Sequence, residues 1–327
     1  SPPLYSSAAS DVYKRQATLM TGFAACSSDD DMTNNFPEDG VVRFNVGVNN
    51  PQTRASHTDG SKVTEFGICI TNNANSNYTY NNVKVTGSNT TAWTPATQML
   101  WQNSTQAVDI VAYSPYVAGK YNTSTTTLPV KVEETQIKDG YTSDFLICKM
   151  PGFKPSTGLI EGGKLNLAFK HALSQLTITV TLGSEFNAPD LVTTNPITDL
   201  KVNGTYIEGI CDFTKESGFV TAKTTEANTI AVAPSEYGEF EKATSLSSNA
   251  KATYQCLLIP QIIEKGKFSV SFKLNGKPYT WTSDQAVTLA ENTAYTLALT
   301  AGKELVVVGE MTANAWQEGS TSNVETE

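Results

Sequence analysis

Side chains that could carry out catalysis are scarce in this sequence. It contains two histidines, His57 in a polar stretch and His171 in "LAFKHALSQL", where a lone histidine is more typical of a structural residue. There is no H-E-x-x-H, G-x-S-x-G or phosphate-binding glycine motif. Carboxylates are numerous, which leaves a paired-carboxylate glycosidase open on composition alone, yet none stands at an aromatic-rich strand end. We therefore predict a protein that is not an enzyme and has no cofactor or metal.

The cysteines offer a second chemistry. Four of the five lie in apolar, strand-like contexts, namely Cys69, Cys148, Cys211 and Cys256. These contexts predict buried thiols. Two disulfides stay open for an exported protein, because the sequence cannot give their connectivity. No C-x-x-C pair occurs, so no zinc site is expected.

The aromatic residues offer a third chemistry, which is stacking on sugars. The candidates are the 13 tyrosines and the four tryptophans, Trp93, Trp101, Trp281 and Trp316. Packing in the core and at strand edges is the alternative. We favour packing, because "YTWTS" and "NAWQEG" stand where predicted strands end.

The arginines are confined to the first part of the chain. They are Arg15, Arg43 and Arg54, and none follows Arg54 although lysines occur throughout. A lysine-biased composition would explain this, and so would an arginine-directed protease that must cut only near the N-terminus. Arg54 lies in "NPQTRASHTDG", whose Pro, Gly and polar residues are typical of an accessible loop. We predict cleavage between Arg54 and Ala55, because Arg43 falls within a predicted strand.

The first 40 residues are predicted to lie outside the folded domains. Residues 1–16, "SPPLYSSAASDVYKRQ", resemble translated sequencing-adapter read-through, and we set them aside. Residues 17–26, "ATLMTGFAAC", resemble a truncated lipoprotein signal peptide, in which acylation of Cys26 would anchor the chain in a membrane. A chance cysteine is the alternative. Residues 27–40 are polar and acidic and should form a disordered tether.

Composition and patterning predict an all-β chain. Charged residues make up 17% of the sequence and hydrophobic ones 39%, and apolar residues alternate with Thr, Asn and Ser. The net charge is −9 without a basic stripe, so nucleic acid is not an expected partner. No later apolar run reaches the roughly 18 residues of a membrane-spanning helix. Further strands are predicted at 63–71, 107–113, 143–149, 164–170, 176–182, 197–210, 253–259, 268–274, 279–281 and 295–299.

The first predicted strand, residues 41–49, alternates cleanly. Val42, Phe44, Val46 and Val48 share one face, which should be buried. Near the other end of the chain, Asn275-Gly276 between alternating runs predicts a hairpin, because both residues tolerate positive φ. We expect two tandem β-sandwich domains, 41–186 and 187–327, with a boundary in the polar stretch 183–196 and a short helix at 172–176.

Several motifs in order resemble the fimbrillins of the Bacteroidetes, the subunits of type V pili. After the cysteine and the acidic tether come a strand, "TRAS", "EFGICI", "VDIVAYSPY", "SDFLICKMPG" and "LNLAFKHALSQLTITV". "YTWTSDQAVTLAENTAYTLALT" and "ANAWQEG" follow near the end, and "FKHALS" and "VAYSPY" are the more specific motifs. The resemblance implies two transthyretin-like β-sandwich domains, surface export as a lipoprotein, cleavage by an arginine-preferring protease and polymerisation by strand exchange.

The residues agree with that mechanism. Cleavage after Arg54 would remove the lipid anchor together with strand 41–49, and would leave a groove whose unpaired edges accept another strand. The candidate donor is the segment 305–327, where Leu305, Val307, Met311, Ala313 and Ala315 share one face. Its alternation is poorer than that of 41–49. The alternative is that it completes the C-terminal domain, which would suit a tip subunit rather than a shaft subunit.

The expected partners follow from this interpretation. They are other pilus subunits, an arginine-specific maturation protease, the outer membrane before cleavage, and a host or bacterial surface ligand. The expected location is the cell surface, in a fimbrium. Two alternatives remain: a monomeric surface lipoprotein that binds glycans through exposed Trp and Tyr, and a tip adhesin of the same pilus.

Overall fold

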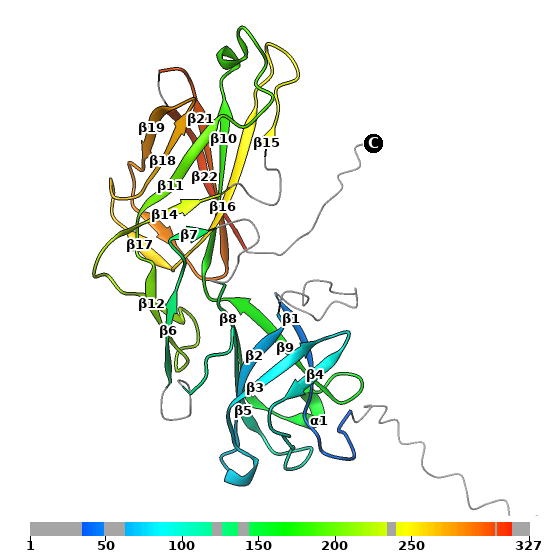
Figure 1. Ribbon diagram of the computed structural model, residues 1–327. Coiled ribbons are helices and arrows are strands. Elements are labelled where there is room, and N and C mark those ends of the chain that lie inside the picture. The colour runs from blue at the N-terminus through cyan, green and yellow to red at the C-terminus, as the bar shows by residue number, and fades with distance from the viewer. Residues whose placement is uncertain are drawn as a thin grey trace, which may run out of the picture. The chain divides into compact units, whose positions relative to one another are not determined.

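Strands dominate the computed structural model of the chain, which describes residues 35–48, 63–119, 126–136, 144–233, 240–304 and 306–315 (Figure 1). Within these ranges there is one α-helix, α1 (Pro155–Gly158), and there are two short 3₁₀ helices, η2 (Ser76–Tyr78) and η3 (Ser184–Asn187). The prediction of an all-β fold with few short helices is confirmed. The helix predicted at 172–176 is wrong, because a strand begins at Ser174.

A seven-stranded sheet forms the N-terminal part of the fold, in the order β1-β9-β8-β5-β2-β3-β4. Its two edge strands are therefore β1 and β4, and β1 pairs in parallel with β9. The strands are β1 (Arg43–Val48), β2 (Glu65–Thr71), β3 (Tyr80–Ser88), β4 (Ala92–Pro95), β5 (Val108–Ser114), β8 (Leu146–Phe153) and β9 (Lys164–His171).

Three strands of this sheet, β2, β5 and β8, place buried residues in two different cores, one on each face of the sheet. On β8, Leu146 and Cys148 enter a core with β1 and β9, which we call the first core. The neighbouring Ile147 points the other way, into a larger second core that contains the C-terminal strands. Two-sided burial explains why "EFGICI" and "DFLICK" read as continuous apolar runs rather than as alternating ones.

The rest of the described chain forms four smaller sheets around the second core. Their orders are β15-β16-β10-β21-β22, β19-β18-β11-β14-β7, β13-β12-β6 and β17-β20. The two five-stranded sheets both place side chains in the second core, as the layers of a sandwich do. Their strands are β6 (Thr127–Lys131), β7 (Thr135–Gln136), β10 (Ser174–Leu182), β11 (Ile197–Thr205), β12 (Glu208–Asp212), β13 (Val220–Ala222), β14 (Asn228–Val232), β15 (Phe240–Glu241), β16 (Lys251–Leu258), β17 (Gln261–Ile263), β18 (Ser269–Leu274), β19 (Lys277–Thr282), β20 (Val287–Leu289), β21 (Thr293–Ala301) and β22 (Val306–Ala315).

Sheet pairing does not follow the expected division at residue 186. The strand β10 lies before that boundary, yet it pairs with β16 and β21 of the C-terminal part. β6 and β7 also lie before it and pair with β12 and β14. β6 and β7 therefore join the C-terminal strands, whereas β8 and β9, which follow them in sequence, belong to the seven-stranded sheet, so the sheets do not divide the chain at a single residue. Alternation identified β10 as a strand but carried no information on which sheet it joins.

The Asn275-Gly276 hairpin is confirmed. β18 and β19 pair in antiparallel register up to Leu274 and Lys277. Asn275 has φ 50° and Gly276 has φ 81°, so both central residues adopt the left-handed conformation that this turn requires. Another prediction needs correction, because the run 197–210 is two strands, β11 and β12, rather than one.

Candidate functional site

The first strand of the described chain, β1, is an edge strand. We call the position that it occupies, beside β9 and against the first core, the β1 seat. It pairs with β9 over six consecutive residues, from Arg43 opposite Lys164 to Val48 opposite Phe169. Just before β1, the Val42 N–H donates to the Met99 carbonyl at 2.9 Å. Figure 1 shows β1 beside β9 at the border of the sheet. A strand in this position is bonded along one edge and has its other edge largely unpaired by backbone.

The inward face of β1 fills pockets in the first core. Val42, Phe44 and Val46 are buried, with 2%, 5% and 1% of their surface exposed. Val48 is half-buried and packs against the same core. The Phe44 ring lies edge-on to Phe66, with centroids 5.5 Å apart. The predicted inward face is therefore present, with Val48 at its less buried end.

The outward face of β1 is polar and partly ionic. Asn45 donates from Nδ2 to Asn166 Oδ1 at 2.8 Å across the parallel pair. Arg43 donates from Nη1 to Asp39 Oδ1 at 2.9 Å. The Arg43 guanidinium and the Val41 N–H together lower the pKa of Asp39 to about 2. Asp39 in turn raises the pKa of Arg43. These contacts hold the entry of the strand without burying charge.

A cavity of about 600 Å³ opens beside the outer edge of β1. It lies between β1 and the β3–β4 hairpin, at the two free edges of the seven-stranded sheet. Phe44, Asn45, Asn89, Trp93 and Lys164 are among the residues that line it. The seam between β1 and β4 is therefore incompletely filled.

The side chain of Asn89 crosses that seam. It lies in the turn between β3 and β4, and its Oδ1 accepts from the Val46 N–H at 3.0 Å. Its Nδ2 donates to the Val46 carbonyl at 2.6 Å. Trp93 donates from Nε1 to the same Oδ1 at 2.8 Å. Sequence reasoning missed this residue, because an asparagine in "GSNTTAW" looks like ordinary turn chemistry.

The predicted cleavage and lipidation sites lie outside the described residues. Cys26 precedes Asn35, while Arg54 and Ala55 fall between Val48 and Val63. The order along the chain is thus β1, the predicted cut and then β2. Arg43, the other arginine near β1, lies within the strand and its ladder to β9.

The candidate donor segment, 305–327, contains β22, and its residues after Ala315 lie outside the described part of the chain. This strand pairs with β21 and is an edge of its five-stranded sheet. The register shifts between Leu297 and Leu299, opposite the segment that contains Gly309. Met311 is half-buried against the second core, whereas Ala313 and Ala315 are exposed. Leu305 and the side chain of Val307 lie outside the described part.

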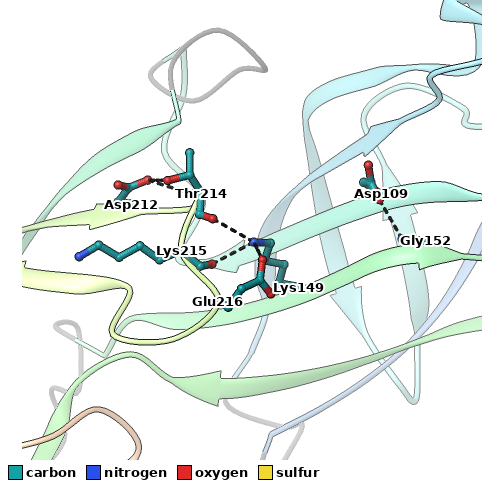
Figure 2. Close-up of polar contacts among 7 residues, drawn as sticks. All are labelled: Asp109, Lys149, Gly152, Asp212, Thr214, Lys215 and Glu216. Atoms are coloured by element: carbon teal, nitrogen blue, oxygen red, sulfur yellow. Dashed lines mark hydrogen bonds and ion pairs between the residues drawn. The ribbon is translucent and has the colours of Figure 1, made fainter.

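A second polar cluster joins β8 to the loop between β12 and β13 (Figure 2). The Lys149 ammonium donates to the carbonyls of Thr214 at 3.3 Å and Lys215 at 2.9 Å, and to Glu216 Oε1 at 2.6 Å. Asp212 caps the start of the loop by accepting from the Thr214 N–H at 2.9 Å. One cation thus ties the seven-stranded sheet to a loop of the three-stranded sheet.

The other candidate residues that the structure describes are packed within the fold. Cys69, Cys148, Cys211 and Cys256 are buried free thiols, and burial raises the pKa of each, to about 11 for the first two and about 12 for the others. His171 is buried, with Nδ1 3.0 Å from Asp144 Oδ1. Trp93 and Trp101 are buried, Trp281 packs against Phe268, and Trp316 is outside the described residues.

The described residues also bear on metal binding and on membrane insertion. No set of three or more His, Cys, Asp or Glu side chains there is grouped so as to hold a metal ion. Within the same ranges, no helix has the length and apolar character needed to cross a membrane.

Comparison with known proteins places this architecture in a family. A family model described as fimbrillin-like matches residues 53–316. A proposed cell adhesion protein from Bacteroides uniformis superposes with a TM-score of 0.60 at 18% identity, over 85% of this chain and 100% of that one. A fimbrial protein from Bacteroides vulgatus gives a TM-score of 0.52 at 15% identity, over 85% and 99%. A search of curated proteins gives no match. The family match spans most of the sequence, and the chain therefore belongs to the fimbrillin-like family.

Proposed function

We propose that the protein is a structural subunit of a cell-surface pilus that assembles by strand exchange. In this proposal it is exported as a lipoprotein acylated at Cys26 and reaches the outer membrane. An arginine-specific protease then cuts after Arg54, and a strand from a neighbouring subunit replaces β1. The observation that carries the proposal is the position of β1, an edge strand that buries Val42, Phe44 and Val46 in the first core and precedes the predicted cut.

The free energy lost when β1 leaves would favour its replacement by another strand. Val42, Phe44 and Val46 each contribute about 1.5–3 kcal/mol of burial, so loss of β1 would remove roughly 5–9 kcal/mol. That sum is an upper bound, because unfolded chains are already partly compact. The whole stability of a domain is about 5–15 kcal/mol. An unoccupied seat is therefore costly, and a donated strand restores both the apolar contacts and the backbone pairing.

Head-to-tail contact then gives a filament. The seat is beside β9 and the candidate donor is in β22, so donor and acceptor are different surfaces. Such a heterologous contact does not close on itself and builds an open chain of subunits.

The test is cleavage with an arginine-specific endoprotease. We expect a product that begins at Ala55, followed by oligomers visible on native gels and as filaments by electron microscopy. Arg54→Gln should stay uncut at this position and monomeric, whereas Arg43→Gln should behave like the wild type. A protein that is cut at Arg54, loses residues 1–54 and remains monomeric would contradict assembly by strand exchange.

The pairing of β22 with β21 supports a second role, that of a tip subunit. A tip would accept a strand but keep β22 in its own sheet. A disulfide between Thr296→Cys and Thr312→Cys, which are Cα partners across β21 and β22, separates the roles. If β22 is the donor, the oxidised variant should fail to polymerise after cleavage and the reduced variant should succeed. A tip subunit should form no homopolymer in either state and should still take up a shaft subunit.

A further inference from the structure

The backbone amides on the outer edge of β1, the edge that faces away from β9, differ in their surroundings. Successive residues of a strand direct their N–H and C=O groups to opposite edges. The Val42 and Val46 amides bond to Met99 and Asn89, away from β9. The amide of Phe44 therefore points to the same outer edge, where the residue lines the cavity. On this edge the Val46 amide is hydrogen-bonded to Asn89, whereas the Phe44 amide lies beside the cavity.

The Asn89 side chain hydrogen-bonds to the backbone of Val46 in the way that a peptide group of a neighbouring strand would. A carboxamide has one carbonyl acceptor and one N–H₂ donor, and here they meet the N–H and the C=O of the same residue, Val46. Two residues of an antiparallel ladder exchange the same pair of bonds. Trp93 fixes the orientation, because its indole N–H is a donor only and so must face the Asn89 oxygen. The amide is held by the β3–β4 hairpin rather than by β1.

We infer that Asn89 is a specificity-determining residue that reads the backbone of whichever strand occupies the β1 seat. The partner it fits is an extended segment with a free N–H and C=O at the position of Val46. Proline or any N-substituted residue is disfavoured there, because it would deprive the Asn89 oxygen of the backbone N–H and leave only the Trp93 donor. The inference rests on the proposed strand exchange. Residues 305–327 contain no proline, so the candidate donor meets the requirement at any register.

The first test uses the intact full-length protein and does not depend on strand exchange. Amide hydrogen exchange measured by NMR should show Val46 protected and Phe44 exchanging faster. Asn89→Ala should raise the exchange rate of Val46 at least about tenfold and leave Phe44 unchanged. Thr90→Ala, an exposed change in the same turn, should alter neither. Unchanged protection of Val46 in Asn89→Ala would overturn the inference.

The second test measures recognition of an added strand. Full-length protein is cut after Arg54, and labelled peptides of residues 41–50 are added in three forms: unmodified, N-methylated at Val46 and N-methylated at Phe44. Methylation at Val46 should weaken binding about tenfold. Methylation at Phe44 should have little effect, because that amide faces the cavity. In Asn89→Ala the penalty at Val46 should disappear.

The outcomes separate the two proposals. Equal binding of the unmodified peptide and the Val46-methylated peptide would overturn the reading of the backbone by Asn89 while strand exchange stands. Failure of all three peptides, with Val46 still protected in the intact protein, would overturn strand exchange and with it the recognition of a donor.

Discussion

The ring of Phe44 lies edge-on to the ring of Phe66, with centroids 5.5 Å apart and planes inclined by 81°. Phe66 also contacts Trp93 and Phe169, at 5.3 and 5.8 Å between centroids. A side chain of the edge strand β1 therefore belongs to the aromatic centre of the first core, so the core is incomplete without that strand.

Phe44→Ala should destabilise the intact protein by about 3–5 kcal/mol, because it removes an aromatic side chain from a packed core. Asn45→Ala, one residue away and facing outward, is the matched control and should cost about 1 kcal/mol or less. Urea unfolding of both variants measures the difference. Similar losses in the two variants would mean that β1 does not fill the core.

Lys149→Met should lower the free energy of unfolding by about 1–2 kcal/mol. The substitution removes charge-assisted hydrogen bonds to two carbonyls and a carboxylate. The expected loss is kept small because Glu216 is well exposed, so solvent weakens its ion pair with Lys149. Lys215→Met is the control, since its ammonium bonds to Gly218 and Thr221 at the same loop without reaching β8. Limited proteolysis of the loop 213–219 should accelerate in Lys149→Met more than in the control. Equal acceleration would assign the effect to the loop alone.

The Arg43–Asp39 ion pair should be detectable as a lowered pKa of Asp39. Carboxyl NMR titration should give Asp39 a pKa of about 2, and Arg43→Gln should raise that pKa towards the ordinary aspartate value of 3.8. The Val41 N–H, which donates to Asp39 at 3.1 Å, should keep it somewhat below that value. Because the folded pKa is lowered, any stability from the pair is present above about pH 4 and is lost as the pH falls towards 2. An unchanged Asp39 pKa in Arg43→Gln would contradict the assignment.

The four buried cysteines should resist alkylation in the folded protein. Burial raises the pKa of Cys256 to about 12, and thiolate, the reactive form, is scarce at pH 8. Iodoacetamide followed by mass spectrometry should label all four only after unfolding in denaturant. Thr90→Cys provides an exposed thiol that should react at once. Rapid labelling of the native protein at any of the four would show that its surroundings open readily.

Gly276→Ala should destabilise the β18–β19 hairpin by about 1 kcal/mol. The cost comes from the backbone, because φ is 81° and the added Cβ meets nothing within 4 Å. Asn275→Gly at the neighbouring left-handed position should be near neutral. Thermal unfolding compares the two, and equal shifts in Tm would argue against backbone strain as the cause.

Local sequence predicted the strands that have a repeated physical signal. Val42, Phe44 and Val46 alternate with polar residues, and they are the buried face of β1. Asn275-Gly276 predicted its hairpin because few residue pairs tolerate two positive φ angles. β3 and β4 lie in polar sequence without a clear alternation, and neither is among the strands that the sequence predicted. The cut site, the lipidation site and the transthyretin-like topology remain predictions.

The sequence by itself determined the all-β class, the amphipathic first strand and the absence of catalytic motifs, because these depend on residue type and short-range spacing. Only the tertiary structure decided that β10 joins the C-terminal sheet and that Lys149 reaches the loop of Glu216. It also decided that Asn89 meets Val46, 43 residues away in sequence. Such pairings are set by which surfaces pack together over long range, and the same alternation or the same polar side chain is compatible with many of them.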